Sequence, residues 1–173
     1  MYCRAPIDFT GIIYYTKSDK RVIFIYLLLI EFHLNNDMIS KILVAVDGSK
    51  NADKAFEYAC DLAKKAGASL LILHVSEELG TVGYSINKEL ERDYREMLQK
   101  YESRAKKVMK TYVDVMEAKA NDVAEEVLRT ADKENIDTIV VGSRGISEAK
   151  MFLLGSVSYK VSHYARRPVV IVR

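Results

Sequence analysis

Short apolar segments that alternate with helical patterns are the feature that most constrains the fold of this chain. Residues 41–47 (KILVAVD) form a nearly continuous apolar run rich in β-branched side chains, and similar runs occupy residues 69–75 and 138–141. Such runs are typical of strands buried on both faces, as in a parallel sheet with helices on either side. A weaker strand is expected at 113–118 and a last one at 168–172. We therefore predict five strands.

The segments between these strands have the spacing of amphipathic helices. Apolar residues in 55–66 recur at three- and four-residue steps, and Gly67 follows as a C-terminal signal. Further helices are expected at 85–109, at 122–134 with Asp122 as its cap, and at 156–165. Because parallel neighbours need crossover connections, this order predicts an α/β fold with an open, doubly wound, five-stranded parallel sheet of the Rossmann-like class.

The first 37 residues differ from the rest in composition. They hold nearly half of the aromatic residues of the chain and a single alanine, Ala5. The apolar run at 22–30 is too short for a membrane span, which needs about 20 residues, and no signal-peptide cleavage site follows it. Three interpretations stay open: an added strand or helix that covers the domain, a membrane-surface anchor, or an untranslated stretch upstream of a native start at Met38. We therefore treat 1–37 as an extension and 38–173 as the domain.

Charge and cysteine content exclude several classes of protein. The formal net charge is +2, which leaves no broadly basic face for nucleic acid. Cys3 and Cys60 lack the paired spacing of zinc or redox motifs, and two cysteines make no disulfide framework. Cys60 is expected to be buried and inert, and His74, inside a predicted strand, to be a hydrogen-bonded core residue. We expect a cytoplasmic protein without metal-binding side chains, nucleic-acid binding or membrane association.

The most distinctive motif follows the predicted strand at 138–141. The sequence GSRG at 142–145 is followed, after nine residues, by Gly155 and Ser156 at the start of the last predicted helix. Glycines permit close backbone approach to an anion, and a helix start offers unpaired N–H groups and a positive dipole end. Ligands of open parallel sheets bind at the carboxyl ends of the strands. The motif therefore predicts a triphosphate site, with the hydroxyls of Ser156 and Ser158 as donors.

Five segments in this order, KILVAVDGS, LLILHVSE, DTIVVGSRG, GSVS and PVVIVR, resemble the universal stress protein family and specifically its nucleotide-binding branch. The resemblance covers 38–173 and none of the extension. It implies the strand order 3-2-1-4-5, ATP as the ligand, and a homodimer joined through the last strand, here Val169 to Val172. Because no carboxylate cluster lies near the glycine motif in the sequence, we expect Mg²⁺ or Mn²⁺ to bridge the phosphates rather than bind to side chains.

The resemblance also implies which residues hold ATP. Gly142, Gly145, Gly155, Ser156 and Ser158 would contact phosphates and ribose, Asp47 would contact the nucleoside, and Ala45, Val46 and Val75 would line the adenine pocket; Val141, Ser143, Arg144 and Val157 complete the set. Two residues have alternatives. Arg144 either neutralises a phosphate or lies in solvent. Asp47 either contacts the ligand or only caps the following helix, and the two roles are compatible.

Three functions stay open. The first is an ATP-binding, cytosolic, homodimeric regulator of the stress or energy response. The second is a slow ATPase or a nucleotide-dependent switch with enzymatic turnover, and the third is a nucleotide-free dimeric scaffold. The Walker motif G-x4-G-K-(S/T) is absent, and the sequence specifies no general base or other catalytic residue. Binding is therefore favoured over catalysis.

Overall fold

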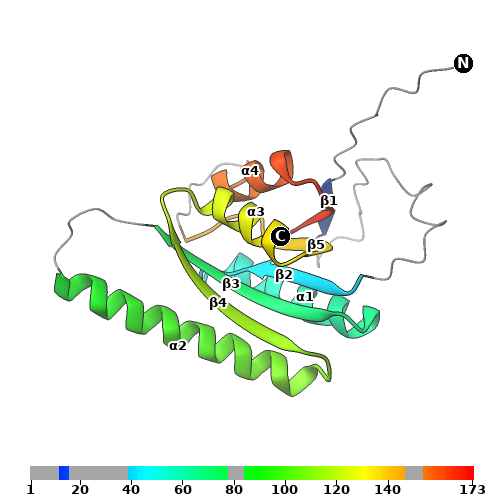
Figure 1. Ribbon diagram of the computed structural model, residues 1–173, viewed down its shortest axis with the longest axis horizontal. Helices are drawn as coiled ribbons and strands as arrows, with labels where there is room; N and C mark the ends of the chain where they lie inside the picture. The colour runs from blue at the N-terminus through cyan, green and yellow to red at the C-terminus, as the bar shows by residue number, and fades with distance from the viewer. Residues whose placement is uncertain (1–11, 16–38, 78–83, 147–153) are drawn as a thin grey trace, which may run out of the picture.

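The computed structural model describes residues 12–15, 39–77, 84–146 and 154–173, and only the backbone of 12–15 and 84–88. Within this part of the chain, strands and helices alternate after a short first strand (Figure 1). The elements are β1 (Ile12–Tyr15), β2 (Lys41–Ala45), α1 (Lys50–Ala66), β3 (Ser69–Glu77), α2 (Tyr84–Val108), β4 (Val113–Ala120), α3 (Val123–Lys133), β5 (Thr138–Gly142), α4 (Ser156–Tyr164) and β6 (Val169–Val172).

The sheet confirms the predicted class and strand order. Its order is β1-β6-β5-β2-β3-β4, and every neighbouring pair is parallel. The five predicted strands are β2 to β6, so their order from the β4 edge is 3-2-1-4-5 in chain order, as expected. β1 is a sixth strand, from the extension, and it lies beside β6 at the edge of the sheet.

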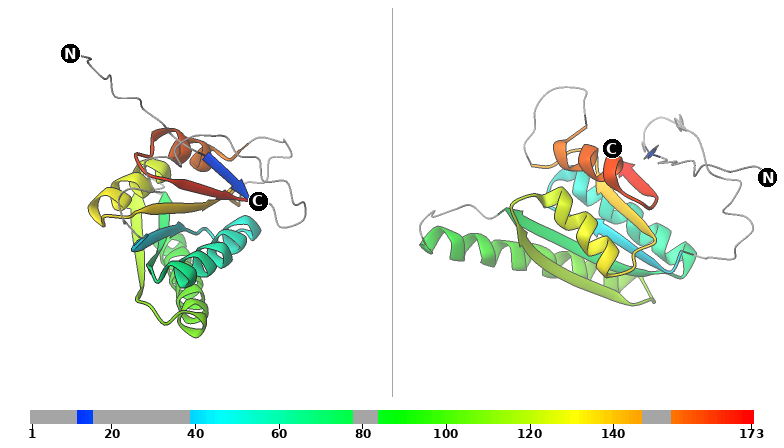
Figure 2. Two further views of the ribbon diagram at one scale, coloured as in Figure 1. Left: turned by 90° about the vertical axis from the view of Figure 1, so that its right-hand side faces the viewer. Right: turned by 45° about the horizontal axis from the view of Figure 1, so that its top comes forward.

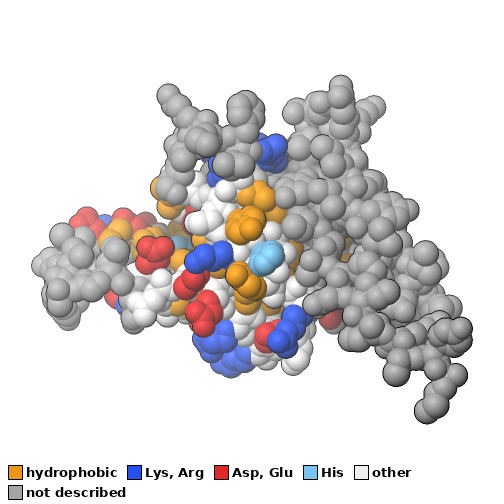
Figure 3. Space-filling model, turned by 90° about the horizontal axis from the view of Figure 1, so that it is seen from above, with side chains coloured by type: hydrophobic (Ala, Val, Ile, Leu, Met, Phe, Trp, Pro, Cys, Tyr) orange, Lys and Arg blue, Asp and Glu red, His pale blue; other side chains and the backbone are white. Residues whose placement is uncertain are grey.

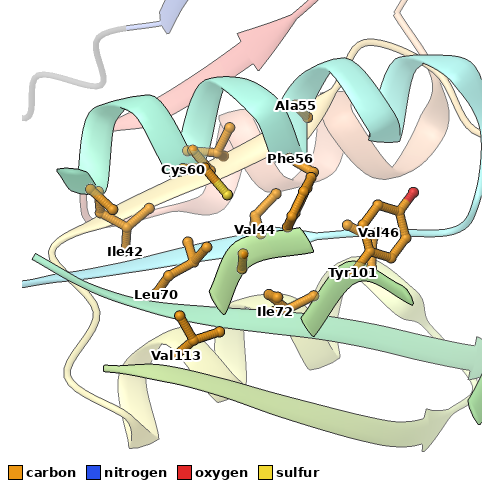
Figure 4. Close-up of a cluster of buried hydrophobic side chains, with 14 of the residues drawn as sticks. Ile42, Val44, Val46, Ala55, Phe56, Cys60, Leu70, Ile72, Tyr101 and Val113 are labelled. Carbon is orange, nitrogen blue, oxygen red and sulfur yellow. The ribbon is translucent and has the colours of Figure 1, made fainter. Parts of the chain in front are cut away.

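Helices cover both faces of the sheet, as Figure 2 shows. α1 and α2 pack on one face, and α3 and α4 pack on the other. Because successive strand residues point to opposite faces, Ile42 and Val44 face the first pair of helices and Leu43 faces the second. Figure 4 shows the first cluster, where the rings of Phe56 and Tyr101 lie 4.8 Å apart between centroids. The central strands are therefore buried on both faces.

Local signals explain where the helices begin and end. Ser49 is the N-cap of α1, and its hydroxyl oxygen accepts the N–H of Ala52 at 3.1 Å. Gly67 ends α1 with φ of 69°, a left-handed conformation that glycine adopts without strain. Asp122 caps α3 by accepting the N–H groups of Ala124 and Glu125, as predicted. The cap of α1 is therefore Ser49, and the alternative role of Asp47 as that cap is wrong.

The remaining expectations concern the apolar run of the extension, the thiol of Cys60 and the charges on the surface. The apolar run at 22–30 lies outside the described residues, and no helix in the described part of the chain is long and apolar enough to cross a membrane. Cys60 is buried, and burial raises the pKa of its thiol to about 12, which keeps it protonated and unreactive. On the face seen in Figure 3, basic and acidic side chains are interspersed rather than gathered into a patch of one sign.

Candidate functional site

The chain leaves the adjacent strands β2 and β5 toward opposite faces of the sheet. Ala45 and Val141 are neighbours near the carboxyl ends of these strands. β2 is followed by α1 on one face, whereas β5 is followed by α4 on the other. Connections that diverge in this way open a crevice, which is where open α/β sheets bind ligands. A cavity of about 730 Å³ lies there, and we call it the switch-point cavity.

The switch-point cavity brings together nearly all of the residues predicted to hold ATP. They are Ala45, Val46, Asp47, Val75, Val141, Gly142, Arg144, Gly145, Gly155, Ser156, Val157 and Ser158. Ser143 is the exception, because its side chain is buried and does not line the cavity. Its N–H donates to the carbonyl of Val172 at 2.7 Å, and its carbonyl accepts the N–H of Gly155 at 2.9 Å. Ser143 therefore joins the glycine loop to β6 and α4.

Some walls of the cavity were not anticipated from the sequence. They are formed by Ala52, Leu73, His74, Ser76, Glu77, Tyr94, Val123, Val127, Ile146 and Leu154. His74 is 4% exposed, and its Nδ1 donates to the carbonyl of Val46 at 2.8 Å, as expected for a hydrogen-bonded core histidine. The Tyr94 ring lies against it at 4.3 Å between centroids. The helical spacing of apolar residues in the sequence predicted that Tyr94 is a core residue. That spacing contains no signal that this turn of α2 reaches the cavity.

Asp47 ties the end of β2 to the glycine loop. Its Oδ1 accepts the N–H of Ser49 at 3.0 Å, and its Oδ2 accepts the N–H of Ile146 at 3.1 Å. Nearby, the Ser49 hydroxyl donates to the carbonyl of Arg144 at 3.4 Å, the long end of the hydrogen-bond range. The carboxylate therefore holds the loop against the start of α1, and it does so from a position on the cavity wall.

Close packing within the loop disfavours a side chain at two glycines of the motif, most strongly at Gly145. A Cβ at Gly145 would lie 2.6 Å from Asp47 Oδ2, closer than atoms can approach. A Cβ at Gly155 would lie 3.2 Å from the Cα of Arg144, a backbone atom that moves only with the loop. The motif thus has a structural role in addition to any role toward a ligand, because only glycine lets these segments approach so closely.

The start of α4 is bare. Its N-cap, Gly155, has no side chain to accept a hydrogen bond, whereas α1 and α3 have the side-chain caps described above. The first helical bond runs from the N–H of Tyr159 to the carbonyl of Gly155. The N–H groups of the first turn, at Ser156, Val157 and Ser158, precede that bond and carry the positive end of the helix dipole on the cavity wall. This arrangement favours an anion.

The two serines of this turn differ. Ser156 is exposed, so its hydroxyl faces solvent or a ligand. Ser158 is buried, and its hydroxyl donates to the carbonyl of Gly142 at 2.6 Å. The single hydroxyl proton of Ser158 thus joins α4 to the end of β5 in this structure. Ser158 can offer a ligand its N–H and the hydroxyl lone pairs.

The other side of the cavity combines apolar walls with an open backbone edge. The last main-chain hydrogen bond between the segment that follows β2 and the neighbouring strand β3 runs from the N–H of Val46 to the carbonyl of Leu73 at 2.9 Å. β3 continues to Glu77, and strand alternation turns the N–H and C=O of Val75 to the same side as those of Leu73. β2 ends at Ala45, which pairs with Leu73, so β2 does not extend alongside Val75. A donor and an acceptor therefore lie side by side next to the apolar side chains of Ala45 and Val141.

Charged groups are few in the cavity. Asp47, Glu77 and Arg144 are its charged lining residues among those described, and Arg144 is half-buried. The described residues include no group of three or more His, Cys, Asp or Glu side chains that could hold a metal ion. Binding of an anion here would therefore depend on backbone N–H groups and Arg144 rather than on a cluster of charges.

The fold and the site together define a class: an open, doubly wound α/β protein with a glycine loop and a bare helix start at its switch point. Within this class, the sequence profile of the universal stress protein family matches residues 38–173. The chain belongs to the universal stress protein family. Universal stress protein YxiE of Bacillus subtilis (strain 168) is 38% identical over 148 residues, which cover 79% of this chain and 100% of that protein.

Solved structures share the fold. MJ0577 of Methanocaldococcus jannaschii matches with a TM-score of 0.70 at 24% identity, covering 79% of this chain and 98% of that one. A universal stress protein from Archaeoglobus fulgidus in complex with dAMP matches with a TM-score of 0.62 at 22% identity, covering 79% of this chain and 100% of that one. At these identities the likeness shows a common fold.

Proposed function

We propose that this protein is an ATP-binding universal stress protein that holds the nucleotide in the switch-point cavity. The observation that carries the proposal is the bare start of α4 beside the glycine loop. In this proposal the first-turn N–H groups at Ser156 and Val157 bind the phosphates, and Arg144, which also lines the cavity, neutralises part of their charge. Gly155, which leaves the helix start without a side chain, keeps the approach open.

The base and sugar would lie toward β3. The N–H and C=O of Val75 match the acceptor and donor on the Watson–Crick edge of adenine, and Ala45 and Val141 provide apolar contacts for the ring. Asp47, between this edge and the phosphate side, is the acceptor for a ribose hydroxyl. The complex of the Archaeoglobus fulgidus relative with dAMP supports an adenine nucleotide as the class of ligand.

A divalent cation would enter with the nucleotide. The described residues offer no cluster of metal ligands, so Mg²⁺ or Mn²⁺ would be held by phosphate oxygens and water, as Mg²⁺ commonly is. Binding rather than turnover is proposed, because both oxygens of Asp47 already accept peptide N–H groups. We further propose that nucleotide occupancy makes the protein a cytosolic regulator of the stress or energy response.

The test is a change of charge at the start of α4. Ser156→Asp places a carboxylate where the phosphates are proposed to bind, while an acid in the first turn favours the helix itself. Ser156→Asn is the matched control, similar in size and uncharged. We expect calorimetry to show that Asp lowers ATP affinity about tenfold or more relative to Asn, with the free energy of unfolding unchanged or higher. Equal affinities in the two variants would place the phosphates elsewhere.

A second measurement separates this proposal from a nucleotide-free scaffold. Protein purified without added nucleotide is denatured, and the supernatant is analysed by mass spectrometry. We expect an adenine nucleotide from the wild-type protein and less from Ser156→Asp. If neither protein releases a nucleotide and neither binds ATP in the calorimeter, the scaffold is the better account.

A further inference from the structure

His74 binds a carbonyl group that a regular parallel sheet would use elsewhere. β2 ends with Ala45 paired with Leu73. The next two residues, Val46 and His74, therefore lie side by side. In a regular parallel ladder, a residue placed like Val46 donates its N–H to the residue before its neighbour and accepts the N–H of the residue after it. Regular pairing would therefore join Val46 to both Leu73 and Val75.

The structure contains the first of these two bonds and replaces the second. The N–H of Val46 donates to the carbonyl of Leu73 at 2.9 Å. The carbonyl of Val46 accepts Nδ1–H of His74 at 2.8 Å, so it is directed to the imidazole rather than across to Val75. In the described part of the chain, no main-chain carbonyl accepts the N–H of Val75 on this side, and Val75 lines the switch-point cavity.

Neighbouring residues hold the imidazole in the orientation that this bond needs. Leu73 and Val75 belong to the cluster under α3 and α4, so strand alternation turns His74 to the opposite face of the sheet, toward α2. There the ring of Tyr94 lies 4.3 Å from the imidazole between centroids. Because a carbonyl oxygen can only accept, Nδ1 carries a proton. His74 is therefore a donor held in place against Val46.

The other ring nitrogen makes histidine a costly choice at this position. Nε2 of His74 is buried and has no hydrogen-bond partner among the described residues. A buried polar atom without a partner lowers stability, and a phenylalanine ring in the same place would avoid that cost. The donation to Val46 is therefore what histidine supplies here and an apolar ring could not.

We propose that His74 is a positioning residue for nucleotide recognition: it holds the Val46 carbonyl out of the ladder and so keeps the N–H of Val75 open to the ligand. The inference rests on the proposed binding of an adenine nucleotide in the switch-point cavity. An open N–H can donate to N1 of adenine, which is an acceptor, whereas N1 of guanine carries a proton and is repelled. His74 therefore influences the choice of base through Val75.

The experiment compares His74→Phe with His74→Asn in the full chain. Phe keeps an aromatic ring beside Tyr94 but has no donor, whereas the amide N–H of Asn can replace Nδ1–H. Amide hydrogen exchange, measured by NMR without ligand, reports on Val75. We expect its N–H to exchange about tenfold or more slowly in the Phe variant than in the wild type, because the released carbonyl accepts it, and the Asn variant to match the wild type. Equal exchange in the Phe variant and the wild type, or an Asn variant that behaves like Phe, overturns the proposal.

Calorimetry with ATP and with GTP gives the second readout. We expect His74→Phe to lower the affinity for ATP about tenfold or more and to lose most of the preference for ATP over GTP, and His74→Asn to retain both. A Phe variant that keeps the wild-type preference also overturns the proposal. His74→Leu, which lacks a donor as well, replaces the Phe variant if circular dichroism shows that it is unfolded. If the wild type binds no ATP, the proposed function fails, whereas the exchange comparison still decides whether His74 holds the carbonyl of Val46.

Discussion

The backbone N–H of Ile146 donates a hydrogen bond to Asp47 Oδ2 over 3.1 Å, although the two residues are 99 positions apart in the sequence. Through this bond the end of β2 fixes the conformation of the loop that follows β5. The proposed phosphate and nucleoside contacts therefore share one structural element, and changes at Asp47 should affect both the stability of the fold and the binding of ligand.

Removal of the Asp47 carboxylate should destabilise the domain. Asp47→Ala removes the acceptor for two peptide N–H groups, whereas Asp47→Asn keeps one acceptor oxygen. Because unpaired donors are costly, we expect Ala to lower the free energy of unfolding by about 1–3 kcal/mol and Asn to lower it less. Urea unfolding of the two variants beside the wild type measures this. An Ala variant as stable as the wild type would mean that the loop does not depend on Asp47.

Gly145→Ala should lower the stability of the domain strongly only in a background that retains the Asp47 carboxylate. The new Cβ would lie 2.6 Å from Asp47 Oδ2, so the carboxylate or the loop must move. We expect Gly145→Ala to lower the free energy of unfolding by about 1–3 kcal/mol in the wild-type background and by much less in the Asp47→Ala background. A double-mutant cycle from urea unfolding gives the coupling energy, and a coupling near zero would contradict the proposed clash.

The stability that Asp122 contributes should depend on pH. Its pKa is lowered by the hydrogen bond from Lys160 and by the N–H groups of Glu125 and Ala124. A folded-state pKa below the unfolded value means that the contribution is complete above the unfolded pKa, near 4, and is lost as pH falls through the folded pKa.

Asp122→Ala should therefore cost about 1 kcal/mol at pH 7, the usual value of a lost N-cap, and the difference from the wild type should shrink below about pH 4. Asp122→Asn keeps a capping oxygen without the charge and serves as the control. Urea unfolding at a series of pH values gives both curves. A difference between wild type and Ala that stays constant down to the lowest pH would show that the charge of Asp122 contributes nothing.

Residues 38–173 should fold and bind nucleotide without the extension. Of the elements and cavity-lining residues that the structure describes, β2 to β6, helices α1 to α4 and the whole described lining of the switch-point cavity lie in this part of the chain. We expect the truncated protein to unfold cooperatively and to bind ATP with the affinity of the full chain. A truncated protein that is insoluble, or folded but unable to bind ATP, would show that residues 1–37 supply part of the core or of the site.

The sequence predicted the elements and the place of the site, because both depend on local patterns. Apolar runs marked β2 and β5, and the rule that parallel strands end at the same edge placed Asp47 near Gly142. Contacts that depend on loop geometry were not predictable. The bond from the Ser158 hydroxyl to the Gly142 carbonyl and the burial of Ser143 follow from how closely α4 approaches β5.

β1 was predictable only as one alternative among three. A strand of four residues inside an extension rich in aromatic side chains has no periodicity long enough to identify it or to set its register. β1 pairs with the outer edge of β6, and the residues of β6 lie far from β1 in the sequence. Local patterns carry no information on such an edge.

Nucleotide binding in the switch-point cavity is tested most directly by calorimetric titration of the full chain with ATP in the presence of Mg²⁺, beside a parallel titration with inorganic phosphate. We predict saturable binding of ATP at one site per chain, about tenfold or more tighter than binding of phosphate, because adenine, ribose and phosphates would each contact a different wall of the switch-point cavity. If ATP binds no better than phosphate, the switch-point cavity is not a nucleotide site.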